Sequence, residues 1–219
     1  LSAMLLGTLG AIAVIWGSWQ ALQAQRLKLM AAYSTVAQIG YLFISLPLIV
    51  ALPEGALKDA AFTALLLMAL THGFAKSAFF LSAGVIQQYC GHDRIAELAG
   101  TARALPLTTF VIALSGVALI GLPPSGSFIG KWYLISSSFQ AGQWWWVVVI
   151  AVGSILATAY VFRVLGHAFG PRESVGRVLN GGREEIPALM LALFATLVLG
   201  LGSFGLWDFV SQHSNFPGS

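Results

Sequence analysis

The stretch "GLPPSGSFIGKWYLI", Gly121–Ile135, decides where the helix that contains it must break. It lies within Leu105–Gln140, a segment of 36 residues whose only charge is Lys131. As one helix this segment would be about 54 Å long, whereas the hydrocarbon core of a bilayer is about 30 Å thick. Pro124 has no amide hydrogen and prevents a continuous helix. The sequence therefore predicts two half-helices around Gly121–Ser127, a break that includes Pro123, Pro124, Ser125, Gly126 and Ser127.

The composition is that of a membrane protein. Hydrophobic residues make up 58% of the 219 residues and charged residues 9%, and the mean hydropathy is +0.83. Soluble domains usually carry about 25% charged residues. Segments of about 18 or more apolar residues are candidate transmembrane helices. Besides Leu105–Gln140 they are Leu1–Leu22, Leu29–Leu52, Ala60–Cys90, Trp144–Leu165 and Ile186–Val210. We expect an all-α, polytopic bundle of about six transmembrane helices, one of them discontinuous.

The basic residues outside these segments lie in alternate loops. One set of loops carries Arg26, Lys28, Arg94, Arg103, Arg163, Arg172, Arg177 and Arg183. The other set carries only Lys58, which Glu54 and Asp59 balance. Cytoplasmic loops are enriched in lysine and arginine, so this asymmetry predicts that both ends of the chain lie on the outer side of a bacterial or archaeal inner membrane.

Other features limit the classes of protein. The single cysteine, Cys90, excludes an internal disulfide framework and a four-thiolate metal site. We expect no cofactor, no metal and no nucleic-acid partner. The chain begins at Leu1, with no initiator methionine and no basic segment before the first apolar run, so we interpret it as a piece of a longer protein.

The stretch "THGFAKSAFFLSAGVI", Thr71–Ile86, places a histidine and a lysine deep inside the third apolar segment. Lys76 lies roughly 20 Å along a helix from either end of that segment, too far for its side chain to reach water at the surface. A lysine at mid-membrane costs about 2.5 to 3.5 kcal/mol, so it should face a protein or water-filled interior. His72 precedes it by one turn on the same face. Because desolvation disfavours the charged amine, the pair could exchange protons near neutral pH. A plain interhelical contact is the alternative.

Lys131 follows the predicted break. Ser125 or Ser127 could cap the second half-helix, which would place Lys131 about one turn from a helix N-terminus, where the dipole also disfavours a positive charge. Broken backbone is tolerated at membrane depth only where it is buried in protein or lines a water-filled cavity. A discontinuous helix with an ionisable group is typical of ion pathways in transporters. The alternative is a proline kink with an incidental lysine.

The acidic residues all lie in loops or near helix ends. They are Glu54, Asp59, Asp93, Glu97, Glu173, Glu184, Glu185 and Asp208. Neither lysine therefore has a carboxylate at its own depth within this chain. The lysines are either neutral for much of the time or receive counter-charges from elsewhere.

Three blocks of this sequence, taken together, resemble a known family. They are "RLKLMAAYSTVAQIGY" (Arg26–Tyr41), "THGFAKSAFFLSAGVI" and "GLPPSGSFIGKWYLI". Their order and spacing are similar to the second half of the antiporter-like membrane subunits of respiratory complex I, Mrp cation/proton antiporters and membrane-bound hydrogenases. The resemblance spans essentially the whole chain.

The resemblance implies a fold of two inverted repeats, each with a broken helix. Residues 1–219 would form a single transmembrane domain, the second repeat plus the final helix. The hydrophilic axis of the family would pass through Lys76, His72 and Lys131. Lys28 matches a basic position of the family, or it anchors a helix end. A polar face with Ser34, Gln38 and Tyr41 could contribute to the same axis.

The function that follows is a proton-translocating, non-redox membrane subunit of a redox-driven or cation/proton antiport complex. The first repeat is absent, so this chain alone should not form a complete route, and its partners would be the missing N-terminal half and other membrane subunits. Conduction of Na⁺ is one alternative and a purely structural membrane module is another. A retinal lysine would need a buried carboxylate, a haem site would need paired histidines at one depth, and neither pattern is present.

Overall fold

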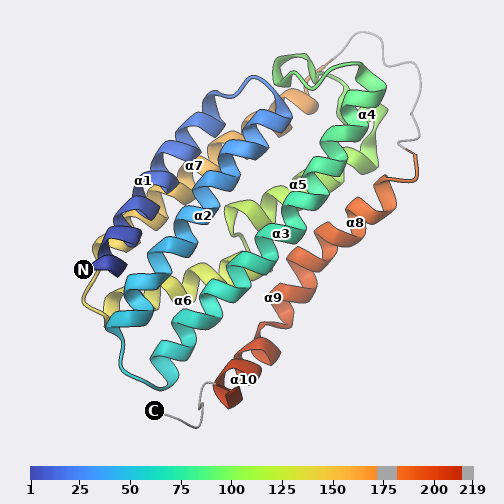
Figure 1. The fold of residues 1–219 in the computed structure, drawn as a ribbon. Helices are drawn as coiled ribbons and strands as arrows, with labels where there is room; N and C mark the ends of the chain where they lie inside the picture. Colours follow the sequence, from blue (N-terminus) through green and yellow to red (C-terminus); the bar gives the residue numbers. More distant parts are fainter. Residues whose placement is uncertain (172–181, 214–219) are drawn as a thin grey trace.

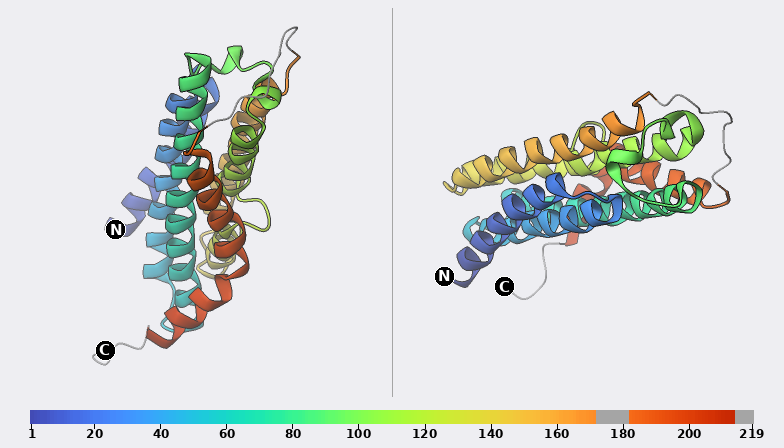
Figure 2. Two further views of the ribbon diagram at one scale, coloured as in Figure 1. Left: turned by 90° about the vertical axis from the view of Figure 1, so that its right-hand side faces the viewer. Right: turned by 90° about the horizontal axis from the view of Figure 1, so that it is seen from above.

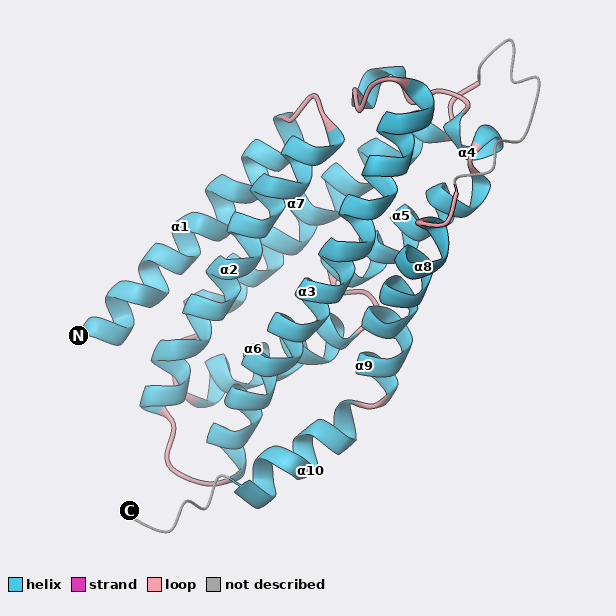
Figure 3. Cartoon of the chain, turned by 45° about the vertical axis from the view of Figure 1, so that its right-hand side comes forward, coloured by secondary structure: helices cyan, strands magenta, loops and turns pink. Residues whose placement is uncertain are grey.

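A computed structural model of the chain describes residues 1–171 and 182–213, and all regular structure in these ranges is helical (Figure 3). The helices are α1 (Ser2–Gln23), α2 (Leu27–Ala51), α3 (Ala56–Cys90), η1 (Ile95–Glu97), α4 (Thr101–Ala104), α5 (Pro106–Ile120), α6 (Gly126–Gln140), α7 (Trp145–Ala168), α8 (Glu185–Leu193), the π-helix η2 (Phe194–Val198), α9 (Leu199–Leu201) and α10 (Ser203–His213). The chain is therefore an all-α, polytopic membrane helix bundle.

The long helices form two layers. Helices α1, α2 and α3 lie side by side in one layer, and α5, α6 and α7 lie in the other (Figures 1 and 2). The segment from α8 to α10 packs against α3 and α5. Many side chains on the outer surface are large and apolar, as expected for helices in contact with lipid.

The break predicted in the fourth apolar segment is confirmed. Helices α5 and α6 have 15 residues each, about 22 Å, so neither half crosses a bilayer by itself. Helix α5 ends at Ile120 and is capped by Gly121, whose φ of +81° favours glycine. The Pro123–Pro124 peptide bond is cis. Ser125 caps α6, because its hydroxyl accepts a hydrogen bond from the Phe128 amide at 3.2 Å. The break is shorter than predicted, since Gly126 and Ser127 already form the first turn of α6.

The helices that are long and apolar enough to cross a membrane are fewer than the six expected segments. Four qualify singly, namely α1, α2, α3 and α7. The segment Ile186–Val210, which we predicted as one crossing, is bent by 61° between Glu185–Leu201 and Ser203–Gln212. With this bent pair the described residues hold up to five such spans. The α5–α6 pair accounts for the sixth segment, and six crossings remain a prediction.

Helix α9 packs against the break between α5 and α6 at a glycine, Gly200. A methyl group added to Gly200 would lie 1.4 Å from the carbonyl oxygen of Pro124, so the two backbones are in direct contact. A methyl group on Gly126 would lie 2.3 Å from Oγ1 of Thr71 and 3.0 Å from Cβ of Leu199. The break is thus enclosed by α3 and α9, which satisfies the requirement that irregular backbone at membrane depth be buried in protein.

The loops that carry the basic residues lie at one end of the bundle. The 24–26 connection pairs with the segment before η1, through hydrogen bonds from Leu27 N to the Asp93 carbonyl (2.8 Å) and from Ile95 N to the Gln25 carbonyl (2.9 Å). The start of α1 and the end of α10 lie at the opposite end (Figure 1). Arg172 and Arg177, which contribute to the predicted charge asymmetry, lie outside the described residues.

Candidate functional site

Lys76 lies inside the bundle, and α2 provides its partners. Its side chain comes from the middle of α3, and the residue is only 6% exposed. Nζ donates to the Ala31 carbonyl at 2.7 Å and to the Ser34 hydroxyl. The Ser34 hydroxyl in turn donates to the Ala31 carbonyl at 3.0 Å. The amine therefore faces protein, as the sequence predicts, and its partners are neutral oxygens.

Lys131 has a similar environment at the broken helix. The residue is 5% exposed, and Nζ donates to the Ile120 carbonyl at 2.8 Å and to the Ser154 hydroxyl at 2.9 Å. Ile120 is the last residue of α5, where helix ends leave carbonyls without an intrahelical partner. Nζ also lies 4.7 Å from the centre of the Tyr41 ring, a cation–π distance. The amine thus belongs to the second half-helix, α6, and one of its hydrogen-bond acceptors belongs to the first half-helix, α5.

A polar face of α2 connects the two lysines. Ser34, Gln38 and Tyr41 are spaced four and three residues apart, so they share one face and extend over about 10 Å of the helix. Ser34 contacts Lys76 at one end, and the Tyr41 ring contacts Lys131 at the other. Gln38, between them, is 4% exposed, and its amide nitrogen has no protein partner. A buried polar atom without a protein partner needs water, so this face favours a hydrated path.

Helix α7 adds polar groups that the sequence analysis missed. Ser154 accepts the hydrogen bond from Lys131. Tyr160 is 3% exposed, and its side chain neighbours Ser34. The signal available in the sequence was a serine and a tyrosine inside a largely apolar helix. Only the packing of α7 shows that they face the lysines.

His72 is half-buried one turn before Lys76, as the spacing predicts. Its Nδ1 atom is buried and has no protein partner. At the same depth on α3, the buried hydroxyl of Thr71 also lacks a partner and lies against the start of α6. The Ser127 hydroxyl in the first turn of α6 is buried and unpaired as well. Unpaired polar atoms therefore gather beside the break.

Lys28 is not brought together with the other two lysines. It is exposed near the start of α2, and Nζ donates to the side-chain carbonyl of Gln87. Gln87 lies eleven residues beyond Lys76 on α3, about 16 Å along the axis. The position of Lys28 fits a role as a helix-end anchor better than a role beside the buried lysines Lys76 and Lys131.

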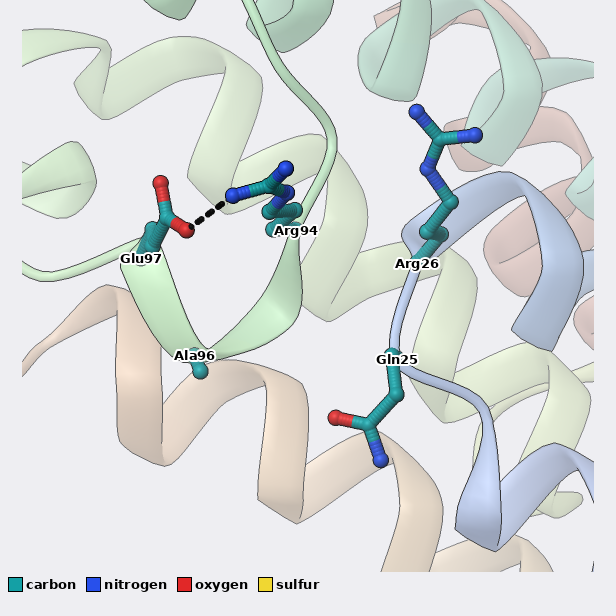
Figure 4. A pocket seen from close by; sticks show the side chains of 5 residues that line it. All are labelled: Gln25, Arg26, Arg94, Ala96 and Glu97. Carbon is teal, nitrogen blue, oxygen red and sulfur yellow. Dashed lines mark hydrogen bonds and ion pairs between the residues drawn. The ribbon is translucent and has the colours of Figure 1, made fainter.

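The surface beside this helix end carries a pocket lined by Gln25, Arg26, Arg94, Ala96 and Glu97 (Figure 4). Arg94 Nη1 donates to Glu97 at 2.9 Å, and this hydrogen bond lowers the pKa of the Glu97 carboxyl. Arg26 Nε pairs with Asp93 at 3.0 Å. These charges neutralise one another at the surface, so we assign the pocket no part in the buried site.

Neither Lys76 nor Lys131 forms an ion pair with an aspartate or glutamate among the described residues, 1–171 and 182–213. A positive charge on either amine would therefore be buried without a counter-charge from these residues, which is costly in free energy.

The fold and the site define a polytopic membrane protein with a broken helix and two cationic side chains in its interior. The family model described as "NADH:quinone oxidoreductase/Mrp antiporter, TM" matches residues 2–157. The chain belongs to this family, which confirms the resemblance drawn from the three sequence blocks.

Known proteins of the family agree in sequence and in fold. NADH-quinone oxidoreductase subunit N of Desulforudis audaxviator is 34% identical over 212 residues, 93% of this chain and 41% of that protein. A chain of the Mrp complex from Dietzia sp. DQ12-45-1b has a TM-score of 0.81 at 23% identity, over 97% of this chain and 46% of that chain. A chain of the membrane-bound sulfane sulfur reductase, an archaeal respiratory membrane complex, has a TM-score of 0.83 at 24% identity, over 97% of this chain and 42% of that chain. The present chain spans less than half the length of each.

Proposed function

We propose that this chain is the second half of a proton-translocating, antiporter-like membrane subunit. The parent assembly would be a redox-driven or cation/proton antiport complex, and the chain itself would carry no redox group. The observation that carries the proposal is the pair of buried amines, Lys76 and Lys131, each held by one backbone carbonyl and one serine hydroxyl and joined by the polar face of α2.

The proton path uses these groups in order. His72 and Lys76 exchange a proton across one helical turn, and the Ser34 hydroxyl and the waters around Gln38 carry it along α2. Lys131 receives it beside Tyr41 and releases it through the break to the outer side. The step is driven by electrostatics, because a charge on one buried amine raises the energy of a charge on the next in a medium of low dielectric constant. Pro123 and Pro124 keep the helix open, while Ser125 starts α6 so that Lys131 meets the Ile120 carbonyl.

The remaining parts of the proposal concern the surroundings. We place the chain in a bacterial or archaeal inner membrane with both ends outside, because the basic loops gather at the other end of the bundle. Its partners would be the half of the subunit that precedes it and other membrane subunits. The relatives are subunits or chains of multisubunit complexes and are more than twice as long as this chain, which supports both partners.

The test compares lysine with arginine at each position in the whole parent complex. Arginine keeps the positive charge and the hydrogen bonds but does not release its proton. We expect Lys76→Arg and Lys131→Arg to lower proton movement into vesicles by about a hundredfold, the lower end of what a positioned acid–base group contributes. Lys58→Gln is the control, since Lys58 pairs with Glu54 at the surface. A pH-sensitive dye follows protons, and radioactive sodium follows Na⁺ in the same vesicles.

Three outcomes separate the hypotheses. Loss of proton movement in both arginine variants, with normal assembly, supports the proposal. Retained movement of both protons and sodium in both variants identifies a structural module instead. Loss of sodium movement with proton movement intact identifies a sodium-conducting subunit.

A further inference from the structure

Glu185 is a buried acid that the proton path described above does not use. It is the first residue of α8 and is 7% exposed, although glutamate is rarely buried without a partner. One carboxylate oxygen, Oε1, accepts a hydrogen bond from the hydroxyl of Thr108 in the first turn of α5. Glu184, its neighbour in sequence, is exposed. The bundle therefore selects one of two adjacent glutamates and places it inside.

The partner of Glu185 is a hydroxyl and not a cation. Within residues 1–171 and 182–213 no lysine, arginine or histidine forms an ion pair with this carboxylate. A proton can therefore bind to it or leave it without breaking an ion pair. A hydroxyl partner can donate or accept a hydrogen bond, so the Thr108 contact is compatible with both states of the carboxyl group.

Two further buried hydroxyls without a protein partner belong to the same level of the helices α3 and α5, which pack against α8. One apolar layer between these helices consists of Ala78, Val111, Ala188 and Ala192. About one helical turn from that layer in sequence, on the side of the basic loops, are Ser82 on α3, Thr108 and Thr109 on α5, and Glu185 on α8. Ser82 and Thr109 are 1% and 3% exposed, and their hydroxyls have no hydrogen-bond partner in the protein. Buried hydroxyls without a protein partner are usually satisfied by water, so this layer favours bound water molecules.

Helix α5 leads from this layer to Lys131. Ser115 lies seven residues after Thr108, two turns further on the same face and about 10 Å along the axis. Its hydroxyl is fully buried and also has no protein partner. Five residues later the Ile120 carbonyl accepts the hydrogen bond of Lys131. One helix thus carries hydroxyls from the buried acid toward the lysine of the break.

We propose that Glu185 is a proton-uptake residue on the side of the basic loops, which passes protons along Thr108 and Ser115 toward Lys131. The inference rests on the proposed function and deepens it by naming a donor for this chain's own lysine. The carboxylate takes a proton from water at the surface end of α8. It then returns to the carboxylate form when the proton moves along the hydroxyls and their waters to the neutral amine.

A structural role for Glu185 makes a different prediction. A carboxylate at a helix N-terminus stabilises the helix dipole, and its bond to Thr108 could simply fasten α8 to α5. Glutamine at this position keeps a side-chain oxygen for the Thr108 hydroxyl but cannot exchange protons. Aspartate keeps the carboxyl group on a shorter side chain. Glu184→Gln is the matched control, because it makes the same chemical change one residue away at an exposed site.

The experiment measures proton movement by vesicles that contain the whole parent complex with Glu185→Gln, Glu185→Asp, Glu184→Gln or Lys131→Arg. We expect proton movement to fall about tenfold or more in Glu185→Gln, to recover in part in Glu185→Asp and to stay unchanged in Glu184→Gln. Infrared difference spectra recorded on energising the complex should contain a deuterium-sensitive carboxyl band that Glu185→Gln removes and Glu184→Gln keeps.

The outcomes distinguish this inference from the proposed function. Equal proton movement in Glu185→Gln and Glu184→Gln, with loss in Lys131→Arg, overturns the role of Glu185 alone. Loss in Glu185→Gln with the carboxyl band still present also overturns it and leaves Glu185 a structural anchor. Unchanged movement in Lys131→Arg overturns the proposed function itself.

Discussion

The contact between Gly200 and the Pro124 carbonyl gives a prediction whose size follows from the structure. An added methyl group would lie 1.4 Å from the carbonyl oxygen, whereas ordinary contacts begin at 3.4 Å. The two backbones would have to separate by about 2 Å, and neither can rotate away as a side chain could. Overpacking of this kind costs about 3 kcal/mol, and the better helix propensity of alanine returns about 1 kcal/mol. The net loss of about 2 kcal/mol corresponds to about 4–8 °C for a protein of this size.

The assay is the apparent melting temperature of the purified complex, measured by fluorescence-detected size exclusion after heating. Gly205→Ala is the control, because no atom lies within 4 Å of a methyl group added there. It should leave the melting temperature unchanged or raise it slightly. We expect Gly200→Ala to lower proton movement as well, since α9 encloses the break beside Lys131. Equal melting temperatures for the two variants would refute the reasoning that α9 holds the broken helix in place.

Two further predictions concern the hydroxyls that hold the site. Ser34→Ala removes one of the two acceptors of Lys76, and a hydrogen bond to a charged group contributes about 1.5–3 kcal/mol, so proton movement should slow by about tenfold to a hundredfold. Ser77→Ala, at an exposed position on the same helix, should leave it unchanged, and equal rates in the two variants would contradict the assignment of Ser34. Ser125→Ala should lower the stability of the complex by about 1 kcal/mol and Ser125→Gly by only a few tenths, because Ser125 caps α6 and glycine is tolerated at caps. Melting temperatures check this order, and an alanine variant as stable as the glycine variant would show that the cap contributes little.

Much of the fold follows from the hydrophobic pattern and from proline chemistry. Pro124 has no amide hydrogen, so the α5–α6 break could be placed from the sequence, whereas α3, with 35 residues and no proline, continues unbroken. The burial of Lys76 also follows from counting residues, since its distance from both helix ends leaves no route to the surface. The bend between Leu201 and Ser203 was not predicted, although Gly200, Gly202 and Ser203 lie at that point of the segment Ile186–Val210. It arises where Gly200 packs against the break, a contact between distant parts of the chain.

The partners of the lysines depend on packing between helices. Helical spacing places Ser34, Gln38 and Tyr41 on one face, but spacing within one helix says nothing about which neighbour that face meets. Ser154 and Tyr160 belong to α7, which follows α2 by almost a hundred residues and reaches the same interior only in the folded bundle. Lys28 lies on the same helix as Ser34, only six residues earlier, but its side chain contacts Gln87 and does not reach the buried amines.

The sequence by itself determined that this chain is a membrane helix bundle, that one helix is broken and that two lysines lie at depths where water does not reach them unaided. These properties depend only on the order of residues along the chain, namely on the length of apolar runs and on the amide hydrogen that proline lacks. The tertiary structure alone decided which of the adjacent acids Glu184 and Glu185 turns inward and which hydroxyls meet it. Identical side chains next to one another differ only in the neighbours that the fold brings to them, and those neighbours set the cost of burying a charge.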